Sequence, residues 1–384
     1  MSRPPIQFNH DVSDCGDFVG QVAGVEDYAS RILPSSKPGD IVFVHERCKP
    51  HLDFVLRHYR QIGLKVGDVV WRTEHTAMLD YLETHQPSVF FYGNGAHKVL
   101  RDYEWHQVTK NMNDKNFATQ FVFEALGVHS PVTLRFEDKR DYDGNLGFNF
   151  PPIHAPEQKS LKFPVVFKPA TGATGIGIEI CNTRDELEIV IGASSGPFQI
   201  QQYHHGIQFL NLQYRVINGK LERFIASEQV LDGNAHIGNR FPVNERIWKA
   251  IGKQMTADAD KLANWMYKRG MKDYFAFDVL VSEKNDLIRY YFLECNPRYN
   301  GASYPSNVCE RLGIKSWMHV NIKTRYRSFD GLDLTSLAYS KEKGDGVIIV
   351  NWGAVNGQKI GVLFAAPTVE RQQQLKDELC KLIG

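Results

Sequence analysis

Three polar residues at the end of an apolar stretch carry the first signal of chemistry. The run 290–293 is aromatic and apolar, which predicts a buried strand, and Glu294, Asn296 and Arg298 follow it. Alternate residues of a strand share a face, so the Glu294 carboxylate and the Asn296 amide point the same way. Their oxygens suit Mg²⁺, and the arginine suits a phosphate or a carboxylate. By themselves, the three residues fit an ordinary polar strand end equally well.

A second carboxylate comes from the preceding strand. Residues 274–281 form an apolar run that contains one acid, Asp278, and an ionised carboxylate in such a run needs a partner or a metal. The polar turn 283–286 folds the chain back, so we expect Asp278 and Glu294 side by side on one hairpin. Cys295 then points the other way, into the core.

A glycine-rich segment offers a place for phosphates. The strand 164–169 contains Lys168, the segment 172–177 brings three glycines, and 178–181 returns as a strand. The spacing is neither a Walker loop nor a dinucleotide-binding fingerprint, because a strand rather than a helix follows it. The backbone N–H groups of such a flap can close over phosphates, with Lys168 as a point charge. A plain turn is the commoner role of a glycine-rich hairpin considered alone.

The elements before these motifs predict a small open sheet. Strands and helices alternate between residues 38 and 106, which favours an α/β domain with parallel strands. The turn 93–95 follows the third strand, at the edge where such sheets bind ligands, although a plain turn is favoured there too. The strands are expected at 41–45, 68–71 and 88–92, with helical spacing at 52–59 and 78–82.

The rest of the chain combines strands with long helices. One helix opens at 113–115 and ends at Gly127, with Phe117, Phe121, Val122, Ala125 and Leu126 on one face. A second spans 244–270, and a third begins near 368. Residues 138–162, 232–242 and 299–303 predict loops. Further strands are expected at 132–136, 198–203, 209–217, 221–230, 346–352 and 360–365, with a hairpin turn at Asn218–Gly219.

Composition narrows the class of protein. The 384 residues have a formal net charge of +1, and no basic stripe favours nucleic acid binding. No apolar run approaches a membrane span, and residues 1–14 lack the apolar core of a signal peptide. The six cysteines are scattered without a Cys-x-x-Cys pair, so neither a zinc site nor a disulfide framework is indicated. We therefore expect a cytoplasmic, reduced protein.

Taken in order, these motifs resemble the ATP-grasp superfamily of carboxylate ligases. The resemblance spans about residues 111–310 and is preceded by what resembles the pre-ATP-grasp domain. It implies an α/β (α+β) protein, in which an N-terminal open α/β domain precedes a two-subdomain ATP-grasp fold with antiparallel sheets. Within the superfamily, the chain is most similar to single-chain ligases that join amino acids or peptides. The expected parts are 1–110, 111–200 with the flap, 201–335 with the metal site, and 336–384 as a C-terminal α/β cap.

The resemblance also implies a role for each motif residue. ATP phosphates would be held by Lys115, Lys168 and the flap glycines Gly172, Gly175 and Gly177. The adenine and ribose would contact Gln201, Gln202, Tyr203, Gln208 and Leu293. Mg²⁺, or Mn²⁺ in its place, would be bound by Asp278, Glu294 and Asn296, and the catalytic residues would be Arg298 and Lys168. Glutamates are usual at the positions of Gln201 and Gln208, so the adenine and ribose contacts lose charge-assisted strength here.

The reaction implied by this resemblance has two steps. A carboxylate attacks the γ-phosphate of ATP to give an acyl phosphate and ADP, and an amine then displaces phosphate. The expected partners are a small carboxylate and a small amine, with no nucleic acid or membrane, and a homodimer is left open. Alternatives are a thiol acceptor, bicarbonate chemistry, or a nucleotide-binding regulator without turnover. The substrate pocket is expected between 93–95, 229–242 and 299–303, with His236 or a nearby acid as a candidate base.

Overall fold

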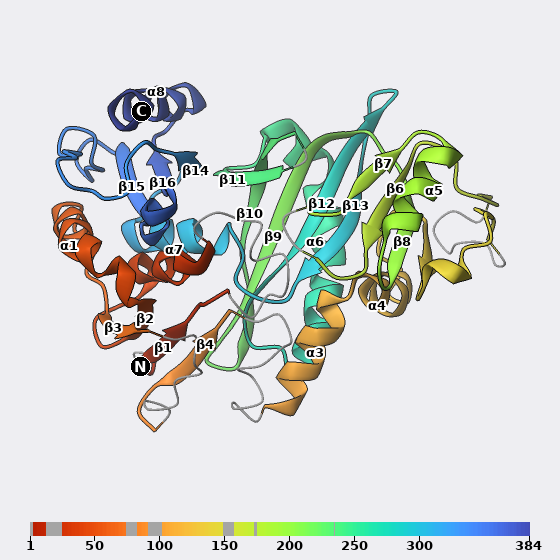
Figure 1. Cartoon of the computed structure of the whole chain (residues 1–384), viewed down its shortest axis with the longest axis horizontal. Helices are drawn as coiled ribbons and strands as arrows, with labels where there is room; N and C mark the ends of the chain where they lie inside the picture. Colours follow the sequence, from red (N-terminus) through yellow and green to blue (C-terminus); the bar gives the residue numbers. More distant parts are fainter. Residues whose placement is uncertain are drawn as a thin grey trace.

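The described part of the chain builds three sheets (Figure 1). The computed structural model describes residues 3–12, 25–73, 83–90, 102–148, 157–172, 175–233 and 235–384. One sheet is parallel and comes from the N-terminal residues, and the antiparallel pairings follow it along the chain. The predicted fold class is therefore confirmed.

The N-terminal sheet has the strand order β3-β2-β1-β4, with all neighbours parallel. Its first strand was not predicted, because the run of β1 is only four residues long. The predicted helix at 78–82, the turn at 93–95 and the last two residues of the strand predicted at 88–92 lie outside the described residues. The elements are β1 (Ile6–Asn9), β2 (Ile41–His45), β3 (Asp68–Arg72), β4 (Gln86–Val89), the helical turns η3 (Val25–Ser35) and η4 (Glu46–His51), and α1 (Leu52–Gln61).

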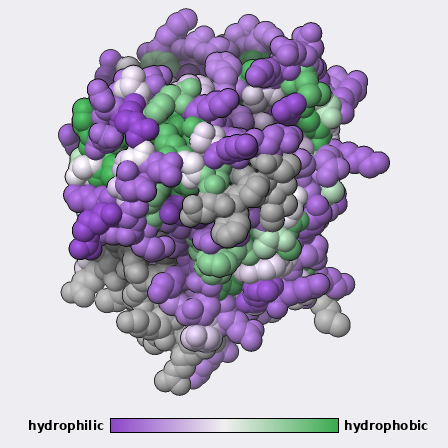
Figure 2. All heavy atoms as spheres, turned by 90° about the vertical axis from the view of Figure 1, so that its right-hand side faces the viewer, coloured by the Kyte–Doolittle hydropathy of each residue, from purple (hydrophilic) through white to green (hydrophobic). Residues whose placement is uncertain are grey.

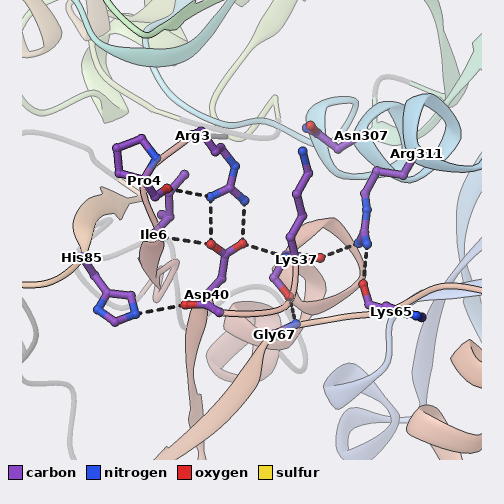
Figure 3. A network of polar contacts seen from close by, with 12 residues as sticks. Arg3, Pro4, Ile6, Lys37, Asp40, Lys65, Gly67, His85, Asn307 and Arg311 are labelled. Atoms are coloured by element: carbon purple, nitrogen blue, oxygen red, sulfur yellow. Dashed lines mark hydrogen bonds and ion pairs between the residues drawn. The ribbon is translucent and has the colours of Figure 1, made fainter. Parts of the chain in front are cut away.

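A polar network ties this sheet to the rest of the molecule (Figure 3). Asp40 accepts two hydrogen bonds from the Arg3 guanidinium, at 2.8 and 2.5 Å, and one from the Ile6 backbone N–H at 2.9 Å. From the other side, Arg311 of α7 (Ser303–Leu312) donates to the carbonyl oxygens of Pro34 and Lys65. These contacts fix the N-terminal sheet against α7, which follows the hairpin that carries Asp278 and Glu294.

The second sheet has the order β5-β8-β6-β7 and carries the flap. Its elements are β5 (Thr133–Phe136), β6 (Val165–Pro169), β7 (Glu179–Cys181), β8 (Phe198–Gln202) and the helix α5 (Arg184–Ala193). α5 begins directly after Thr183, whose side chain accepts a hydrogen bond from the Glu186 backbone N–H. Within the predicted loop 138–162, the described residues include the short η6 (Lys139–Asp141), and Gly147 pairs with Ser160.

The helix predicted from 113 to 127 differs from the expectation in its buried face. It runs as α4 (Lys115–Phe117) and then η5 (Ala118–Glu124), which is a π-helix, after the unpredicted α3 (Tyr103–Asn113). The wider π turn shifts the buried face to Ala118, Thr119, Val122 and Phe123. The prediction that Phe121 packs inward was wrong, since 56% of it is exposed.

The third sheet is the centre of the molecule, with the order β13-β12-β9-β10-β11-β14-β16-β15. The helix α6 (Glu245–Tyr267) lies behind it in Figure 1 and contributes to a core shared with β9, β12 and β13. Its strands are β9 (Gly206–Ile217), β10 (Lys220–Asp232), β11 (Ala235–Phe241), β12 (Asp273–Lys284), β13 (Leu287–Asn296), β14 (Trp317–Lys323), β15 (Gly346–Asn351) and β16 (Lys359–Ala365).

Two features of this sheet depart from the sequence predictions. The loop predicted at 232–242 was wrong, because β11 pairs there with both β10 and β14. Gly238 belongs inside that strand, since a Cβ would lie 1.9 Å from the His319 carbonyl oxygen. The strands of the expected C-terminal cap, β15 and β16, continue the sheet beyond the unpredicted β14, while η7 (Gly353–Gly357) and α8 (Val369–Ile383) complete the chain.

On the side of the flap sheet, the described residues form no large apolar band (Figure 2). That face is mostly hydrophilic, with separated apolar groups (Figure 2). Among the described residues, no helix combines the length and apolarity that crossing a membrane requires.

Candidate active site

The hairpin that carries Asp278 and Glu294 forms as the sequence predicted. Asp278 on β12 lies directly opposite Glu294 on β13. Asn296 Nδ2 donates to Asp278 Oδ2 at 2.9 Å, and Asn211 Nδ2 on β9 donates to Asp278 Oδ1 at 2.6 Å. Cys295 points into the core, where its Sγ lies 3.7 Å from Met266 Sδ, so that prediction is confirmed as well.

A β-bulge in β13 determines which face of the sheet the predicted metal ligands Glu294 and Asn296 point to. The register changes beside Asp278, so that Val279 pairs with Phe292 and Leu293 is the extra residue. Phe292 therefore stays in the core, while Glu294 two residues later faces the opposite side of the sheet. Simple alternation from Phe292 would have put Glu294 in the core. The bulge is thus part of what builds the site, and no local sequence pattern signals it beyond the polar residues themselves.

Arg298 is held beside this hairpin. Pro297 follows the end of β13, and Arg298 Nη2 donates to Asn296 Oδ1 at 3.1 Å. Another guanidinium nitrogen donates to Asn113 Oδ1, and the guanidinium carbon lies 5.8 Å from the centre of the Phe90 ring. The arginine is therefore oriented from three segments, with Asn296 shared between it and Asp278.

Two lysines approach the carboxylates from the flap side. Lys115 Nζ lies 3.3 Å from Glu294 Oε2 and donates to the Gly172 carbonyl oxygen at 3.4 Å. Its backbone is fixed by Asp114, which caps the helix, and by a 2.8 Å bond from its own N–H to the Ala170 carbonyl. Lys168 on β6 is buried. The structure thus brings Lys115, Lys168, Asp278 and Glu294 into one electrostatic cluster.

The charges of this cluster perturb one another. Burial lowers the pKa of Lys168 to about 8, and Lys115 contributes in the same direction. Burial and the neighbouring Glu294 raise the pKa of Asp278 to about 7. Burial opposes ionisation of Glu294 too, but Lys115, Lys168 and Arg298 hold its pKa below the usual value. Clustered cations beside a carboxylate pair suit a ligand that carries both phosphates and a metal.

The residues present fit a hard divalent cation. The donor set consists of two carboxylates and one amide, and burial makes the adjacent Asp278 and Glu294 charges unfavourable without a cation. In the described part of the chain, no three His, Cys, Asp or Glu side chains gather as a metal site would require. The predicted metal site reaches three ligands because the amide oxygen of Asn296 is counted with the carboxylates of Asp278 and Glu294.

The flap lies over the same position. A cleft is lined by Lys115, Pro169, Gly172, Gly175, Ile176, Ile178 and Glu294. Gly175 and Gly177 adopt φ values of 80° and 75°, which favour glycine, and a Cβ on Gly177 would lie 2.9 Å from Pro169 Cγ. Residues 173–174 lie outside the described part. The flap glycines and the metal-site carboxylate therefore face one space, although they are more than 100 residues apart in the chain.

None of the predicted adenine and ribose contacts is among the described residues that line this cleft. Gln201 is buried and donates to Thr133 Oγ1 at 3.1 Å, and Gln202 donates to the Lys162 carbonyl at 2.9 Å. Gln208 donates to the Gln229 carbonyl at 3.2 Å. Tyr203 and Leu293 are half-buried. Their roles toward adenine and ribose stay predictions, since each glutamine amide already has a protein partner.

A row of polar side chains, which the sequence analysis missed, extends the site across the central sheet. Asn211 lies opposite both Asp278 and Ser227, and Ser227 Oγ accepts from Asn239 Nδ2 at 3.2 Å. Asn239 in turn lies opposite His319 on β14. We call Glu294, Asp278, Asn211, Ser227, Asn239 and His319 the polar row. Its members come from six strands, so no local sequence pattern could reveal it.

Comparisons with known proteins agree with this architecture. No family model matches the chain. Over 258 residues it is 26% identical to the D-alanine–D-alanine ligase of Fusobacterium nucleatum, which covers 62% of this chain and 83% of that protein.

Solved structures match over the whole length. A biotin carboxylase β-γ-ATP complex from Campylobacter jejuni has a TM-score of 0.62 at 14% identity, covering 100% of this chain and 92% of that one. An N5-carboxyaminoimidazole synthetase from Staphylococcus aureus, complexed with ADP, has a TM-score of 0.59 at 13% identity, covering 100% and 98%. The fold is that of the ATP-grasp superfamily, which confirms the resemblance carried by the motifs.

Proposed function

We propose that this protein is an ATP- and Mg²⁺-dependent ligase that activates a carboxylate as an acyl phosphate and joins it to an amine. The observation that carries the proposal is the single cleft lined by Lys115, the flap residues Gly172 and Gly175, and Glu294. A glycine-rich flap, lysines and a carboxylate pair in one space are the parts that phosphoryl transfer needs. A binding protein without turnover has no need of paired acids beside a phosphate-facing arginine.

The chain's own residues have separate tasks in this reaction. Lys115 and Lys168 neutralise the phosphates of ATP, and the flap backbone closes over them and excludes water from a reactive acyl phosphate. Arg298, which donates to Asn296 and Asn113, would contact the transferred phosphate and the acyl group. No side-chain nucleophile is required, because the substrate carboxylate itself attacks ATP.

Asp278, Glu294 and Asn296 would hold the metal. When bound, Mg²⁺ supplies charge neutralisation for the phosphate oxygens. Asn211 donates to Asp278 at 2.6 Å and so orients the carboxylate toward the position shared with Glu294.

The nature of the acceptor rests on sequence similarity. The relative from Fusobacterium nucleatum is named a D-alanine–D-alanine ligase, which joins two amino acids, and this favours an amine acceptor and an amino-acid-like substrate. A second candidate is bicarbonate as the activated carboxylate. It is favoured by the biotin carboxylase domain dimer of the 2-oxoglutarate carboxylase from Hydrogenobacter thermophilus, solved with MgADP and bicarbonate (TM-score 0.58, 13% identity, 98% of this chain and 90% of that one). That structure also keeps a homodimer open for this chain. A cytoplasmic location and the four-part domain division stand as part of the same proposal.

Product analysis tests the proposal most directly. The protein is incubated with ATP, Mg²⁺, pooled amino acids and small carboxylic acids, and products are identified by mass spectrometry beside a measurement of ADP release. A new amide with stoichiometric ADP is expected. ADP release that depends on bicarbonate alone would favour the second candidate, and ADP release at background with every pool would refute both.

Variants connect the activity to the cleft. Glu294→Gln should lower ADP release by about 10³-fold, because several kcal/mol of charge stabilisation are lost. Glu283→Gln is the matched control: Glu283 lies on the same hairpin but pairs with Arg246, away from the cleft. Equal losses in both variants would contradict the assignment of Glu294.

A further inference from the structure

Among the residues that the structure describes, no carboxylate forms an ion pair with Arg31. Its guanidinium carbon lies 4.2 Å from the centre of the Tyr304 ring, 4.9 Å from that of Phe90 and 5.1 Å from that of Tyr28. Within the described chain, no hydrogen bond or ion pair reaches the guanidinium, and its buried Nε has no partner. Aromatic faces stabilise the charge only in part, and they leave the N–H groups unsatisfied.

His319, at the far end of the polar row, also lacks polar partners among the described residues. It is only 5% exposed, yet neither ring nitrogen has a hydrogen-bond partner in the described structure. An imidazole so deeply buried would ordinarily be paired, because each unsatisfied polar atom costs free energy. Burial, with His236 and Arg31 nearby, lowers the pKa of His319 to about 3, so the ring is neutral and donates through one nitrogen.

Asn300 completes a set of donors from three segments. Its Nδ2 is buried and unpartnered in the described residues, while its Oδ1 accepts from the Ala302 backbone. The next residue, Gly301, packs on His236: a Cβ there would lie 2.9 Å from the imidazole Cε1. The loop that carries Asn300 continues to Tyr304, whose ring lies against Arg31. His236 itself is satisfied, since its Nε2 lies 2.9 Å from Asn239 Oδ1.

The distance from this donor set to the proposed reaction centre is short. Arg298 and Arg31 lie against the same ring: their guanidinium carbons are 5.8 and 4.9 Å from the centre of Phe90. The two carbons are therefore no further apart than the sum of those distances, which is roughly the reach of three residues of extended chain. A single substrate of amino-acid or dipeptide size can span both.

We propose that Arg31, His319 and Asn300 form a subsite for an anionic group, a carboxylate or a phosphate, carried by the second substrate of the ligase. The unsatisfied atoms fit an acceptor: a guanidinium fork, an imidazole N–H and an amide NH₂ can all donate to its oxygens. No acidic side chain of the described residues competes for Arg31. The inference rests on the proposed function for the identity of the ligand, although the subsite can be tested without turnover.

Binding of simple anions tests the subsite first. Sodium acetate, potassium phosphate and neutral acetamide are titrated into the full-length protein by calorimetry. All titrations are made in the Lys168→Met variant, so that anion binding under the flap is removed. Acetate or phosphate, whichever the subsite takes, should bind with one site per chain, and acetamide should not. Adding Arg31→Met should weaken that binding about 10- to 100-fold, whereas Arg31→Lys should retain most of it.

A matched control distinguishes the subsite from general loss of charge. Arg269 also lies over an aromatic ring, 3.9 Å from the centre of Trp265, but on the exposed surface of the region after α6. Arg269→Met should leave anion affinity unchanged. Unchanged affinity in Arg31→Met, or an equal loss in Arg269→Met, would overturn the proposal. Circular dichroism verifies that each variant is folded, and Asn300→Ala supplies a second test should Arg31→Met fail to fold.

Turnover then tests the link to the ligase. Amino acids and their carboxamides are compared as acceptors, and phosphorylated amines form a third set. The wild type should prefer one anionic set, and Arg31→Met should raise KM for that set about 10- to 100-fold while leaving the neutral amides unchanged. Equal effects on acids and amides would overturn the specificity role. Absence of all turnover would count against the proposed function alone, because anion binding is measured separately.

Discussion

Phe277 and Asp278 are neighbours on β12, yet their side chains lie on opposite faces of the central sheet. Phe277 is fully buried in the core with α6, together with Phe292 and Cys295 of the adjacent strand. Asp278 faces the other side and begins the polar row with Glu294 and Asn211. Each central strand therefore contributes alternate residues to the fold and to the proposed chemistry. We expect changes on the core face to alter stability and changes on the polar face to alter function.

The strongest test of this comparison is Asp278→Asn. Loss of a predicted metal ligand should reduce ADP release about 10³-fold, measured with a coupled assay at saturating ATP. Stability should rise by about 1 kcal/mol at pH 8, because the buried Asp278 carboxylate is disfavoured when charged. The folded-state pKa of Asp278 is raised to about 7. The wild-type protein therefore loses stability as the pH rises from about 4 to 7, because the buried carboxyl group must ionise. The Asn variant has no such group and should not show this loss. A large loss of stability would mean that the polar face also holds the fold together.

The neighbouring substitution should have the reverse profile. Phe277→Ala removes a fully buried aromatic ring and should lower the free energy of unfolding by about 3–5 kcal/mol, measured by urea denaturation. The fraction that stays folded should retain ADP release within about threefold, since no atom of Phe277 faces the cleft. Exposed Tyr103→Ala is the control for loss of an aromatic side chain and should change stability by less than about 0.5 kcal/mol. Loss of activity in proportion to Asp278→Asn would contradict the separation of the two faces.

The same comparison explains what the sequence could and could not predict. The pairing of the Asp278 and Glu294 strands follows from a polar turn between two apolar runs, and the flap follows from glycines between two strands, because both are local patterns. The bulge at Leu293, which turns Glu294 to the face of Asp278, has no such local signal. β11 was mistaken for a loop because glycine and asparagine, found at positions 238 and 239, are common in turns. Gly238 is required there for another reason: the backbone of β14 approaches it too closely for a side chain. The polar row and the Arg31 subsite join residues from separate strands and loops. Such contacts depend on sheet order, which no local pattern encodes.

A third prediction concerns the acid sensitivity of the polar face. His319 is buried and neutral, with a folded-state pKa of about 3 against 6.5 when unfolded. Below pH 6.5 the unfolded chain takes up a proton that the folded chain cannot, so stability is complete above that pH and declines toward pH 3. Between pH 7.5 and 5 the wild type should lose about 2 kcal/mol more than His319→Asn, measured by urea denaturation at both pH values. Parallel losses in the two proteins would mean that His319 is not buried in its neutral form.

The smallest expected effect tests whether residues of the polar row contribute less to activity the farther they lie from Asp278. Ser227 is fully buried two strands from Asp278, and its Oγ accepts the 3.2 Å bond from Asn239. Ser227→Ala leaves that amide hydrogen without one acceptor, but Asn239 keeps a 3.3 Å bond to the Glu228 carbonyl, so we expect a loss of about 1 kcal/mol in stability. ADP release should fall less than tenfold, because neither Asp278 nor its partner Asn211 loses a hydrogen bond. A loss close to that of Asp278→Asn, measured in the same assay, would show that the row acts as one unit, and the function of the polar face could then not be assigned to the metal site alone.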